Sequence, residues 1–345
     1  MKICWFGLYD RDYSRNGVLI EGLTQVGVDV IECNTLSSGG LKKYFDLIKK
    51  LRSIDNQYDY IYCAFPVNYN VLIAAFFQKK PIVVDAFFPL YEAYVIDRAV
   101  ISKFSPKALV LKFLDWVNIY LSDYVVVDTD SHKEYWLKYD PDKIKVIPVG
   151  ADTNFYYPLS ENKNDLSGPF RVLFHGSYIP LQGVEVIVDA AKYLRKHSDI
   201  QFTFIGSGQT FPEIKSKILK NKLQIELLPW MDQKSLNEKL NESDAVLGIF
   251  GSNEKTDRVI PNKVFQGLAV GKPVITKRTE VMEIVLGGSV YLCEGEGGSL
   301  AEAILDLYKN PSLKTRMAIE GHKKFLNDFV PRVLGMRLVD FLNGR

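Results

Sequence analysis

The polar loop from Gly251 to Ile260 and the helix start after it combine residue types that suit phosphate binding. An apolar run of strand length, Ala245–Phe250, precedes the loop. Pro261 suits the first turn of a helix, whose free N–H groups favour an anion. Arg258 and Lys263 flank that helix start and add positive charge. The stretch fits a phosphate site or an ordinary strand–helix–strand crossover with solvated charges.

Length and composition indicate a globular protein of two domains. A chain of 345 residues is long for one core, and its 47% hydrophobic and 24% charged residues are ordinary values. A net charge of +2 argues against nucleic acid as a partner. The four cysteines lack metal-ligand spacing and suit a reducing compartment. Without a signal peptide or a segment of transmembrane length, we expect a cytoplasmic protein.

Strand-like and helix-like segments alternate through both halves of the chain. The expected strands are 3–8, 28–33, 60–65, 82–87, 124–128, 145–149, 171–175, 201–205, 224–228, 245–250, 274–276 and 290–293. Such alternation predicts an α/β protein with parallel, doubly wound sheets. The polar segment Leu159–Gly168 is the best linker candidate. We therefore predict Rossmann-like domains at 1–158 and 159–320 that face each other across a cleft, and a C-terminal helix in 321–345 that returns to the first domain.

Five sequence segments follow one another in an order and spacing that resemble a known family. They are VIPVGADTNFYYP (146–158), FHGSYIPLQGVEVIVDAAKYL (174–194), FIGSGQ (204–209), LLPWMDQKSL (227–236) and IPNKVFQGLAVGKPVIT (260–276). Together they resemble the C-terminal half of retaining GT-B glycosyltransferases of family 4, also called group 1. The resemblance covers residues 146–310 well and the first half loosely. It implies a nucleoside diphosphate sugar donor in the C-terminal domain, an acceptor in the N-terminal domain, no metal and no protein nucleophile.

Several residues match the donor site that this resemblance implies. Gly176 and Gly206 follow strands and would let the backbone approach a diphosphate closely, or they only form tight turns. Trp230 follows the next strand and would contact the nucleotide base, or it only caps the core. The residues expected to bind the nucleotide sugar are Gly176, Ser177, Gln182, Gly206, Trp230, Arg258, Ile260, Pro261, Asn262, Lys263 and Gln266.

The donor site also departs from the family pattern. Ser177 and Gln182 stand where the family usually has an arginine and a lysine that grip the diphosphate, and Arg258 and Gln266 replace its paired glutamates. Gln266 can still bond ribose hydroxyls, and Arg258 can bind phosphate in bidentate fashion. Positive charge at Arg258 and Lys263 would then stabilise the departing diphosphate. A degenerate, non-catalytic copy of the family remains the alternative.

The acceptor side is less clearly marked. The family often has a histidine after its fourth strand, but VVDAFFPLYEAYVIDR (83–98) contains none. Asp85 is the nearest replacement, and we expect it to be catalytic together with Lys263 and Arg258. Tyr91, Asp97 and Arg98 would line the acceptor site with Asp85. All four could instead be structural.

A second motif invites a different interpretation. Asp128-Thr129-Asp130 resembles the Asp-x-Asp metal clamp of GT-A glycosyltransferases. A helical pattern begins directly after it, so Asp130 or Ser131 is expected to cap a helix instead. We therefore predict no metal site.

These features predict a metal-independent retaining glycosyltransferase that moves a sugar from a nucleoside diphosphate sugar to an acceptor hydroxyl. The acceptor would be a glycan or a lipid-linked molecule, and no cofactor is expected beyond the donor substrate. Two alternatives stay open, namely a non-catalytic nucleotide-sugar-binding homologue and a sugar-nucleotide epimerase.

Two segments of the N-terminal half interleave apolar and basic residues. Val100–Ser122 is rich in Leu, Val, Phe and Trp, and Leu41–Arg52 carries several lysines. This composition suits the surface of an anionic membrane, which predicts peripheral attachment at its inner face. In the alternative, Leu109, Phe113 and Trp116 belong to the core and the lysines are solvated. The lysines in question are Lys42, Lys43, Lys49, Lys50, Lys103, Lys107 and Lys112.

Overall fold

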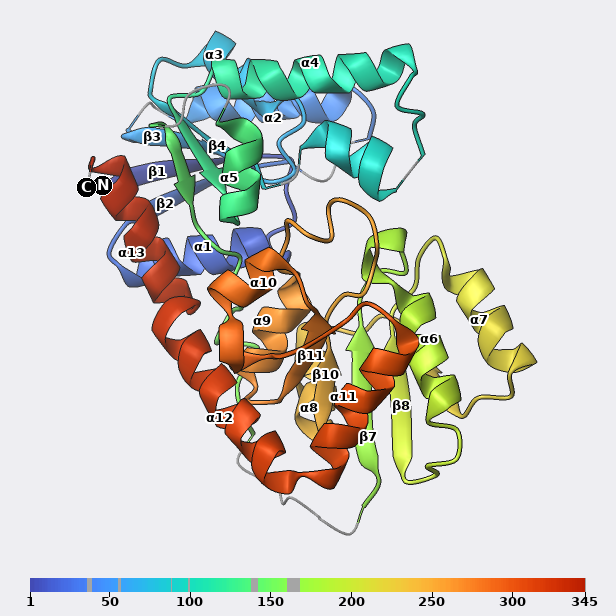
Figure 1. The fold of residues 1–345 in the computed structure, drawn as a ribbon. Helices are drawn as coiled ribbons and strands as arrows, with labels where there is room; N and C mark the ends of the chain where they lie inside the picture. The colour runs from blue at the N-terminus through green and yellow to red at the C-terminus, as the bar shows by residue number, and fades with distance from the viewer. Residues whose placement is uncertain are drawn as a thin grey trace. The chain divides into compact units, whose positions relative to one another are not determined.

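The chain folds into two compact units, which Figure 1 shows as a ribbon. The computed structural model describes residues 1–35, 39–54, 57–87, 89–98, 100–137, 142–159 and 168–344. Unit 1 comprises Met1–Asp152 and Val330–Arg345, and unit 2 comprises Thr153–Phe329. The predicted linker, 159–168, falls almost entirely outside the described residues.

Unit 1 is built on a parallel sheet with the strand order β2-β1-β3-β4-β5-β6. The strands are β1 (Lys2–Gly7), β2 (Asp29–Asn34), β3 (Tyr60–Cys63), β4 (Ile82–Asp85), β5 (Tyr124–Val127) and β6 (Ile144–Val146). The helices are α1 (Ser14–Gln25), α2 (Lys42–Ser53), α3 (Asn70–Phe77), α4 (Pro106–Tyr120), α5 (Asp130–Trp136) and α13 (Pro331–Leu342), with a π-helical segment η1 (Glu92–Asp97).

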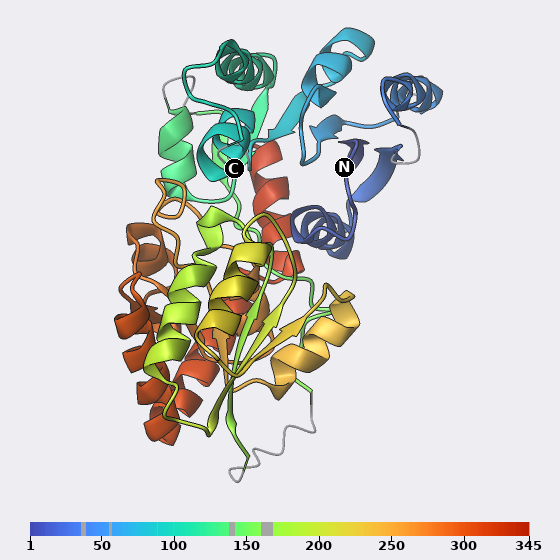
Figure 2. The same ribbon diagram turned by 90° about the vertical axis from the view of Figure 1, so that its right-hand side faces the viewer.

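Helices cover both faces of this sheet, as a parallel sheet requires. Leu47 of α2, Val71 of α3 and Ile119 of α4 are buried in one core cluster against the strands. Leu19 of α1 and Leu334 of α13 are buried in the cluster on the other face. The layer formed by α2, α3 and α4 therefore has one inner surface and one outer surface (Figures 1 and 2).

Glycines allow α13 to pack directly against α1, and the two helices lie side by side in Figure 1. A Cβ on Gly22 would lie 2.0 Å from the carbonyl oxygen of Pro331, and one on Gly335 would lie 2.3 Å from the backbone of Gly22. No side chain fits at such a distance, so the contact needs glycine on both helices. This contact returns the C-terminal end of the chain to unit 1.

Unit 2 repeats the plan with the strand order β12-β11-β10-β7-β8-β9, again parallel throughout. Its strands are β7 (Phe170–His175), β8 (Ile200–Ile205), β9 (Ile225–Leu228), β10 (Ala245–Leu247), β11 (Val274–Lys277) and β12 (Tyr291–Cys293). Its helices are α6 (Val184–Tyr193), α7 (Phe211–Lys220), α8 (Gln233–Glu242), α9 (Asn262–Ala269), α10 (Glu280–Val285), α11 (Gly297–Lys309) and α12 (Pro311–Asp328), with 3-10 turns η2 (Pro180–Gln182) and η3 (Gly287–Ser289).

Unit 1 gives way to unit 2 between Asp152 and Thr153, six residues before the boundary at 158 that the sequence pattern predicts. Residues 153–159 join unit 2 because Asn237 and Asn241 hold them there. The Asn237 side-chain oxygen accepts the N–H of Tyr157 at 3.2 Å, and that of Asn241 accepts the N–H of Leu159 at 2.9 Å. Residues 321–345 are not one helix, since α12 ends at Asp328 and α13, which packs against α1 in unit 1, begins at Pro331. Proline suits a helix start and not its interior.

Candidate functional site

Two glycines of unit 2 bring the loops after β7 and β8 into close contact. The N–H of Gly176 donates to Ile205 O, and the N–H of Gly206 donates to Leu228 O, each at 3.0 Å. A Cβ on Gly206 would lie 2.3 Å from the carbonyl oxygen of Gly176. Both residues have positive φ, +143° and +124°, which glycine tolerates best. Backbone therefore lines the carboxyl edge of the sheet, where ligands of such sheets bind.

Lys263, near the start of α9, reaches this glycine loop. Its Nζ lies 3.9 Å from the centroid of the Phe174 ring and donates a hydrogen bond to the side-chain oxygen of Gln182. A Cβ on Gly176 would lie only 2.8 Å from Nζ, so the glycine makes room for the ammonium group. Lys263 is 4% exposed, and burial lowers its pKa well below the usual value. The structure thus brings Lys263, Gln182 and Gly176 together.

His175 is a buried neighbour of this group. Within the described part of the chain, its Nε2 has no hydrogen-bond partner. Burial, and secondarily the charge of Lys263, lowers its pKa to about 3. The imidazole is therefore neutral at physiological pH.

The central loop is polar, yet its middle is buried and well anchored. Lys255 and Thr256 are 1% and 0% exposed. The Asn253 side-chain oxygen accepts bonds from both the N–H and the hydroxyl of Thr256, each at 3.0 Å. Lys277 ties the loop to β11 by donating to Gly251 O at 3.2 Å. Nothing in the sequence beyond the length of the loop pointed to buried polar residues there.

The remaining donor-site candidates lie around this loop. Arg258 extends from it, with Nη2 3.5 Å from Glu254 Oε2. Pro261 is the N-cap residue of α9, one position before the expected first turn.

Gln266 is buried on the same helix, and Trp230 is 53% exposed. Trp230 Cζ2 lies 3.4 Å from where a Cβ on Gly206 would stand, so this exposed ring borders the glycine loop. Ser177 is exposed, Ile260 is buried, and Asn262 is half-buried.

Asp85 requires a correction. Both of its carboxylate oxygens accept hydrogen bonds from Arg15, at 2.9 Å from Nε and 3.0 Å from Nη2. Both side chains are fully buried, and Arg15 Nη1 also donates to the carbonyls of Ile147 and Pro148. A carboxylate held in this way is not available to a sugar hydroxyl, so Asp85 is structural. Sequence reasoning missed Arg15, because its partner lies 70 residues away.

The other acceptor candidates lie near η1 in unit 1. The backbone N–H of Tyr91 donates to Asp115 Oδ2 at 2.9 Å, and Lys112 Nζ lies 4.4 Å from the Tyr91 ring centroid. Arg98 is exposed and lies 5.7 Å from the Tyr94 ring centroid. The side chain of Asp97 is outside what the structure describes.

Asp128 and its neighbours form a different arrangement from a metal clamp. Thr129, and not Asp130 or Ser131, caps α5 by accepting the N–H of His132 at 3.2 Å. The His132 ring lies between Asp128 Oδ1 and Glu92 Oε2, the latter 3.4 Å from Nε2. Despite complete burial, the two carboxylates raise the pKa of His132 to about 9. Within the described residues, no cluster of three His, Cys, Asp or Glu side chains is placed to hold a metal ion.

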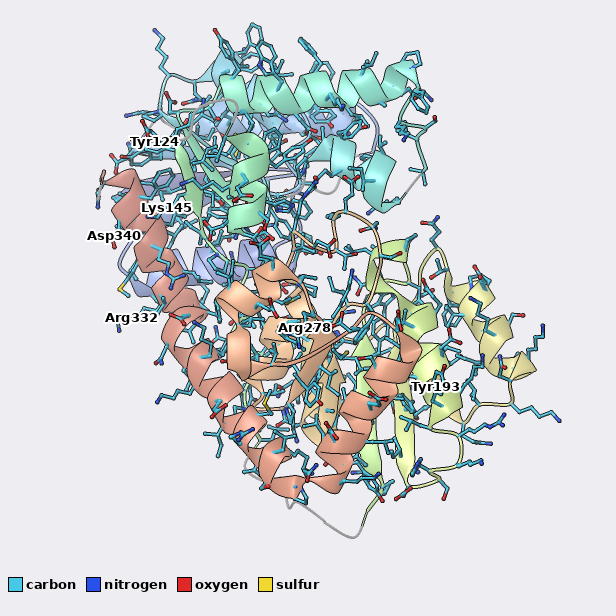
Figure 3. All side chains as sticks on the ribbon, in the orientation of Figure 1. Tyr124, Lys145, Tyr193, Arg278, Arg332 and Asp340 are labelled. Atoms are coloured by element: carbon cyan, nitrogen blue, oxygen red, sulfur yellow. The ribbon has the colours of Figure 1, made fainter. Side chains whose placement is uncertain are left out.

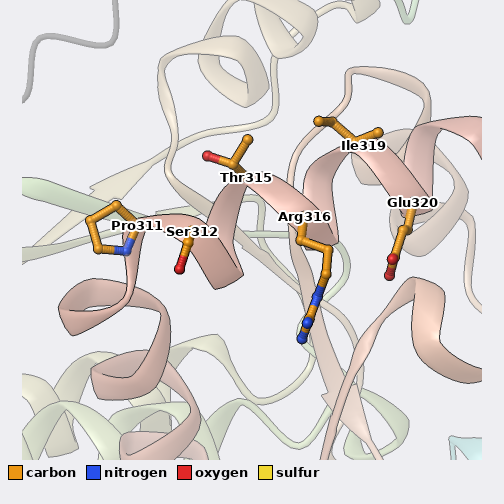
Figure 4. A pocket seen from close by; sticks show the side chains of 6 residues that line it. All are labelled: Pro311, Ser312, Thr315, Arg316, Ile319 and Glu320. Carbon is orange, nitrogen blue, oxygen red and sulfur yellow. The ribbon is translucent and has the colours of Figure 1, made fainter.

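Hollows elsewhere on unit 2 do not coincide with these candidates. One of about 570 Å³ runs along α12 (Figure 4). It is lined by Pro311, Ser312, Thr315, Arg316, Ile319 and Glu320. Another hollow, of about 330 Å³, is lined in part by Arg278, which is labelled in Figure 3. Arg278 Nε lies 3.2 Å from Glu294 Oε1. We assign no function to either hollow.

The architecture of the described residues, with two parallel sheets flanked by helices, is that of GT-B glycosyltransferases. HepE from Anabaena, solved with UDP and glucose, is 16% identical with a TM-score of 0.74, and the match covers 100% of both chains. Sucrose-phosphate synthase from Thermosynechococcus elongatus is 13% identical with a TM-score of 0.76, over 100% of this chain and 98% of that one. These similarities confirm the predicted fold class.

Sequence comparison agrees for the second unit. Residues 169–310 match the family described as Glycosyl transferases group 1. An uncharacterized glycosyltransferase from Methanocaldococcus jannaschii is 31% identical over 175 residues. That match spans 48% of this chain and 46% of the relative, so it covers about half the length of each. The resemblance to group 1 glycosyl transferases is confirmed over residues 169–310, which contain four of the five motifs.

Proposed function

We propose that this protein is a retaining glycosyltransferase that transfers a sugar from a nucleoside diphosphate sugar to an acceptor hydroxyl without a metal ion. The observation that carries the proposal is the buried side-chain nitrogen of Lys263 beside Gly176, at the carboxyl edge of the sheet in unit 2. The same unit contains the match to group 1 glycosyl transferases.

The chemistry of the proposed site follows from where negative charge appears. Cleavage of the bond to the sugar leaves charge on the diphosphate, and preorganised donors at that point lower the barrier. Lys263 would supply one such donor, and the N–H groups at the start of α9, from Asn262 onward, would supply others. Arg258 would add positive charge from the central loop. The exposed Trp230 ring would stack on the base, and Gln266 would bond the ribose.

Uridine diphosphate is the first nucleotide to test. HepE has been solved with UDP and with UDP-glucose, and it shares the fold of this chain.

Unit 1 would hold the acceptor, a glycan or a lipid-linked molecule, with Tyr91 and Arg98 as candidate contacts. We retain a cytoplasmic location with peripheral attachment to a membrane as part of the proposal. None of the described helices is long and apolar enough to cross a membrane.

A thermal-shift series with UDP, GDP and ADP tests the donor site, because a ligand that binds only the native state raises the melting temperature. Stabilisation at a concentration of 100 times Kd is about 2.7 kcal/mol. We expect UDP to raise the melting temperature most. If no nucleoside diphosphate raises it, the donor-site proposal is wrong.

Incubation with the stabilising nucleotide sugar then separates catalysis from binding. Transfer or slow donor hydrolysis supports an enzyme, whereas binding without turnover supports a non-catalytic homologue. The departures from the family pattern at Ser177, Gln182 and Arg258 are the reason to test for such a homologue. A product inverted at C2 of the sugar would identify an epimerase. We expect turnover to persist in excess EDTA. Complete loss of turnover that Mg²⁺ or Mn²⁺ restores would refute metal independence.

A further inference from the structure

Helix α4 of unit 1 carries its apolar side chains on the outside. Leu109, Phe113, Trp116 and Tyr120 recur at intervals that place them on one face, and they are 68%, 60%, 39% and 67% exposed. The three aromatic rings form a connected row, with centroids 5.7 Å apart for Phe113 and Trp116 and 5.1 Å apart for Trp116 and Tyr120. The alternative in which Leu109, Phe113 and Trp116 belong to the core is therefore wrong.

The inner face of α4 is partly polar, which explains this orientation. Asp115 and Asn118 are 7% and 5% exposed. The two carboxylate oxygens of Asp115 accept the N–H groups of Leu90 and Tyr91 at 2.8 Å and 2.9 Å. Asn118 donates to the carbonyl of Asn68 at 3.3 Å. These bonds fix which side of α4 faces the sheet, so the aromatic row must point away from it.

The exposed apolar surface continues on the neighbouring helices of the same layer. Phe45 of α2 is 70% exposed, and Phe76 of α3 is 82% exposed. Phe104, just before α4, is 87% exposed. Helices α2, α3 and α4 lie next to one another over one face of the sheet (Figure 1). We call their outer surface, with these residues and the α4 row, the aromatic surface.

The charge around the aromatic surface is almost entirely positive. Helix α2 contains Lys42, Lys43, Lys49, Lys50 and Arg52, against the single acid Asp46. Helix α3 has no charged residue, and the one acid of α4, Asp115, is buried. Lys103, Lys107 and Lys112 are all exposed. A second copy of this chain would set these lysines against each other in a two-fold contact, which argues against self-association.

We propose that the aromatic surface docks onto an anionic lipid bilayer, with the α4 row inserted among the acyl chains and the surrounding lysines at the headgroups. Large aromatic side chains with a basic fringe are the composition of helices that lie in the membrane interface. Anionic headgroups complement the lysines and attract the surface within a Debye length. The inference extends the proposed transfer to an acceptor at a membrane, and in that respect it rests on the proposed function.

Co-sedimentation with vesicles tests the docking without donor or turnover, so its failure is distinct from failure of the transferase proposal. The full chain is mixed with vesicles of phosphatidylglycerol and phosphatidylcholine, or of phosphatidylcholine alone, at low and high salt. We expect binding to the anionic vesicles only, weakened several-fold by high salt. Leu109→Ser with Phe113→Ser should abolish binding, and Lys42→Glu, Lys49→Glu and Lys107→Glu together should weaken it several-fold.

A control variant carries equivalent changes on another surface. Helix α7 of unit 2 has the exposed residues Lys215, Leu219 and Lys220. Lys215→Glu, Leu219→Ser and Lys220→Glu together should leave binding unchanged. An equal loss of vesicle binding in this variant would show that binding depends on the overall charge of the protein, and it would refute the docking surface.

Tryptophan fluorescence provides a measurement on the native chain, and its control variant keeps an aromatic ring at position 116. Trp5 and Trp136 are buried, whereas Trp116 and Trp230 are exposed. Vesicles that contain brominated lipid should quench part of the emission of the native chain, and Trp116→Phe should remove that quenched part. The proposal is overturned if the protein stays in the supernatant with anionic vesicles at low salt, if quenching persists without Trp116, or if the α4 variant only dissociates a dimer.

Discussion

The side-chain oxygen of Gln182 accepts a hydrogen bond from the ammonium group of Lys263, and both side chains are buried. In the family that this chain resembles, position 182 usually carries a lysine. The structure gives a physical reason for the exchange, since a lysine here would place a second amino group at hydrogen-bonding distance from Lys263 in a buried site that disfavours charge. A neutral acceptor at 182 instead holds Lys263 beside the glycine loop.

Replacing Gln182 with lysine tests this relationship. A second lysine here would either lose its proton or face Lys263 as a second charge in the same buried site, so Gln182→Lys should lower the melting temperature of the free protein. Saturating UDP should restore more stability to the variant than to the native chain, because a diphosphate neutralises both charges. The melting temperatures of both proteins with and without UDP provide the measurement. An unchanged melting temperature without UDP would show that the two side chains are not coupled.

Lys263→Met should weaken UDP binding and slow transfer while it preserves the packing over Phe174. The loss should be about 1.5–3 kcal/mol, the range for a hydrogen bond to a charged group. Lys272→Ala is the matched control, because Lys272 precedes β11 and so lies at the amino end of that strand. Titration calorimetry and initial rates measure both effects. Equal losses in the two variants would mean that the phosphate site is misplaced.

Binding of UDP should be accompanied by uptake of a proton. Burial lowers the pKa of Lys263 well below its usual value, whereas a diphosphate next to Nζ favours the charged form. The binding enthalpy should therefore vary with the ionisation enthalpy of the buffer, with a slope that corresponds to protons taken up. Lys263→Met should remove this slope. A slope of zero in the native chain would contradict the idea that Lys263 gains charge on binding.

The contribution of His132 to stability should fall as pH rises from 6.5 to 9, in the opposite direction to the contributions of Lys263 and Lys272, whose lowered pKa values favour the folded state at higher pH. The folded-state pKa of this histidine, about 9, exceeds its ordinary value of 6.5, so its stabilising contribution is complete below pH 6.5 and is lost toward pH 9. The contribution lost should be about 3 kcal/mol. Urea unfolding of the native chain and of His132→Gln across this window measures it as the difference between the two pH profiles.

His175 supplies the control for this experiment. Its pKa is lowered to about 3, so its contribution is already complete above pH 6.5 and is lost only as pH falls below that value. His175→Gln should therefore leave the slope between pH 6.5 and 9 unchanged. If both variants change it equally, His132 is not the source of the pH dependence.

The sequence by itself predicted the two sheets and the group 1 resemblance, because their signals are local. Apolar runs bounded by turn residues place strands to within a few residues, as for the expected strand at 171–175 and the observed Phe170–His175. Glycine after a strand is equally visible, and Gly176 and Gly206 adopt the positive φ that only glycine takes easily. These patterns do not depend on what the distant parts of the chain do.

Only the tertiary structure decided which polar groups already have hydrogen-bond partners and which apolar side chains are left exposed. Asp85 looked like a ligand until Arg15, far away in sequence, took both of its oxygens. From the sequence, Leu109 and Phe113 fitted either the core or an exposed surface, and Asp115, bonded to Leu90 and Tyr91, turns the other face of α4 inward. A hydrophobic pattern shows which residues share one face of a helix but not whether that face points to the core or to solvent. The direction depends on contacts between residues that lie far apart in the sequence.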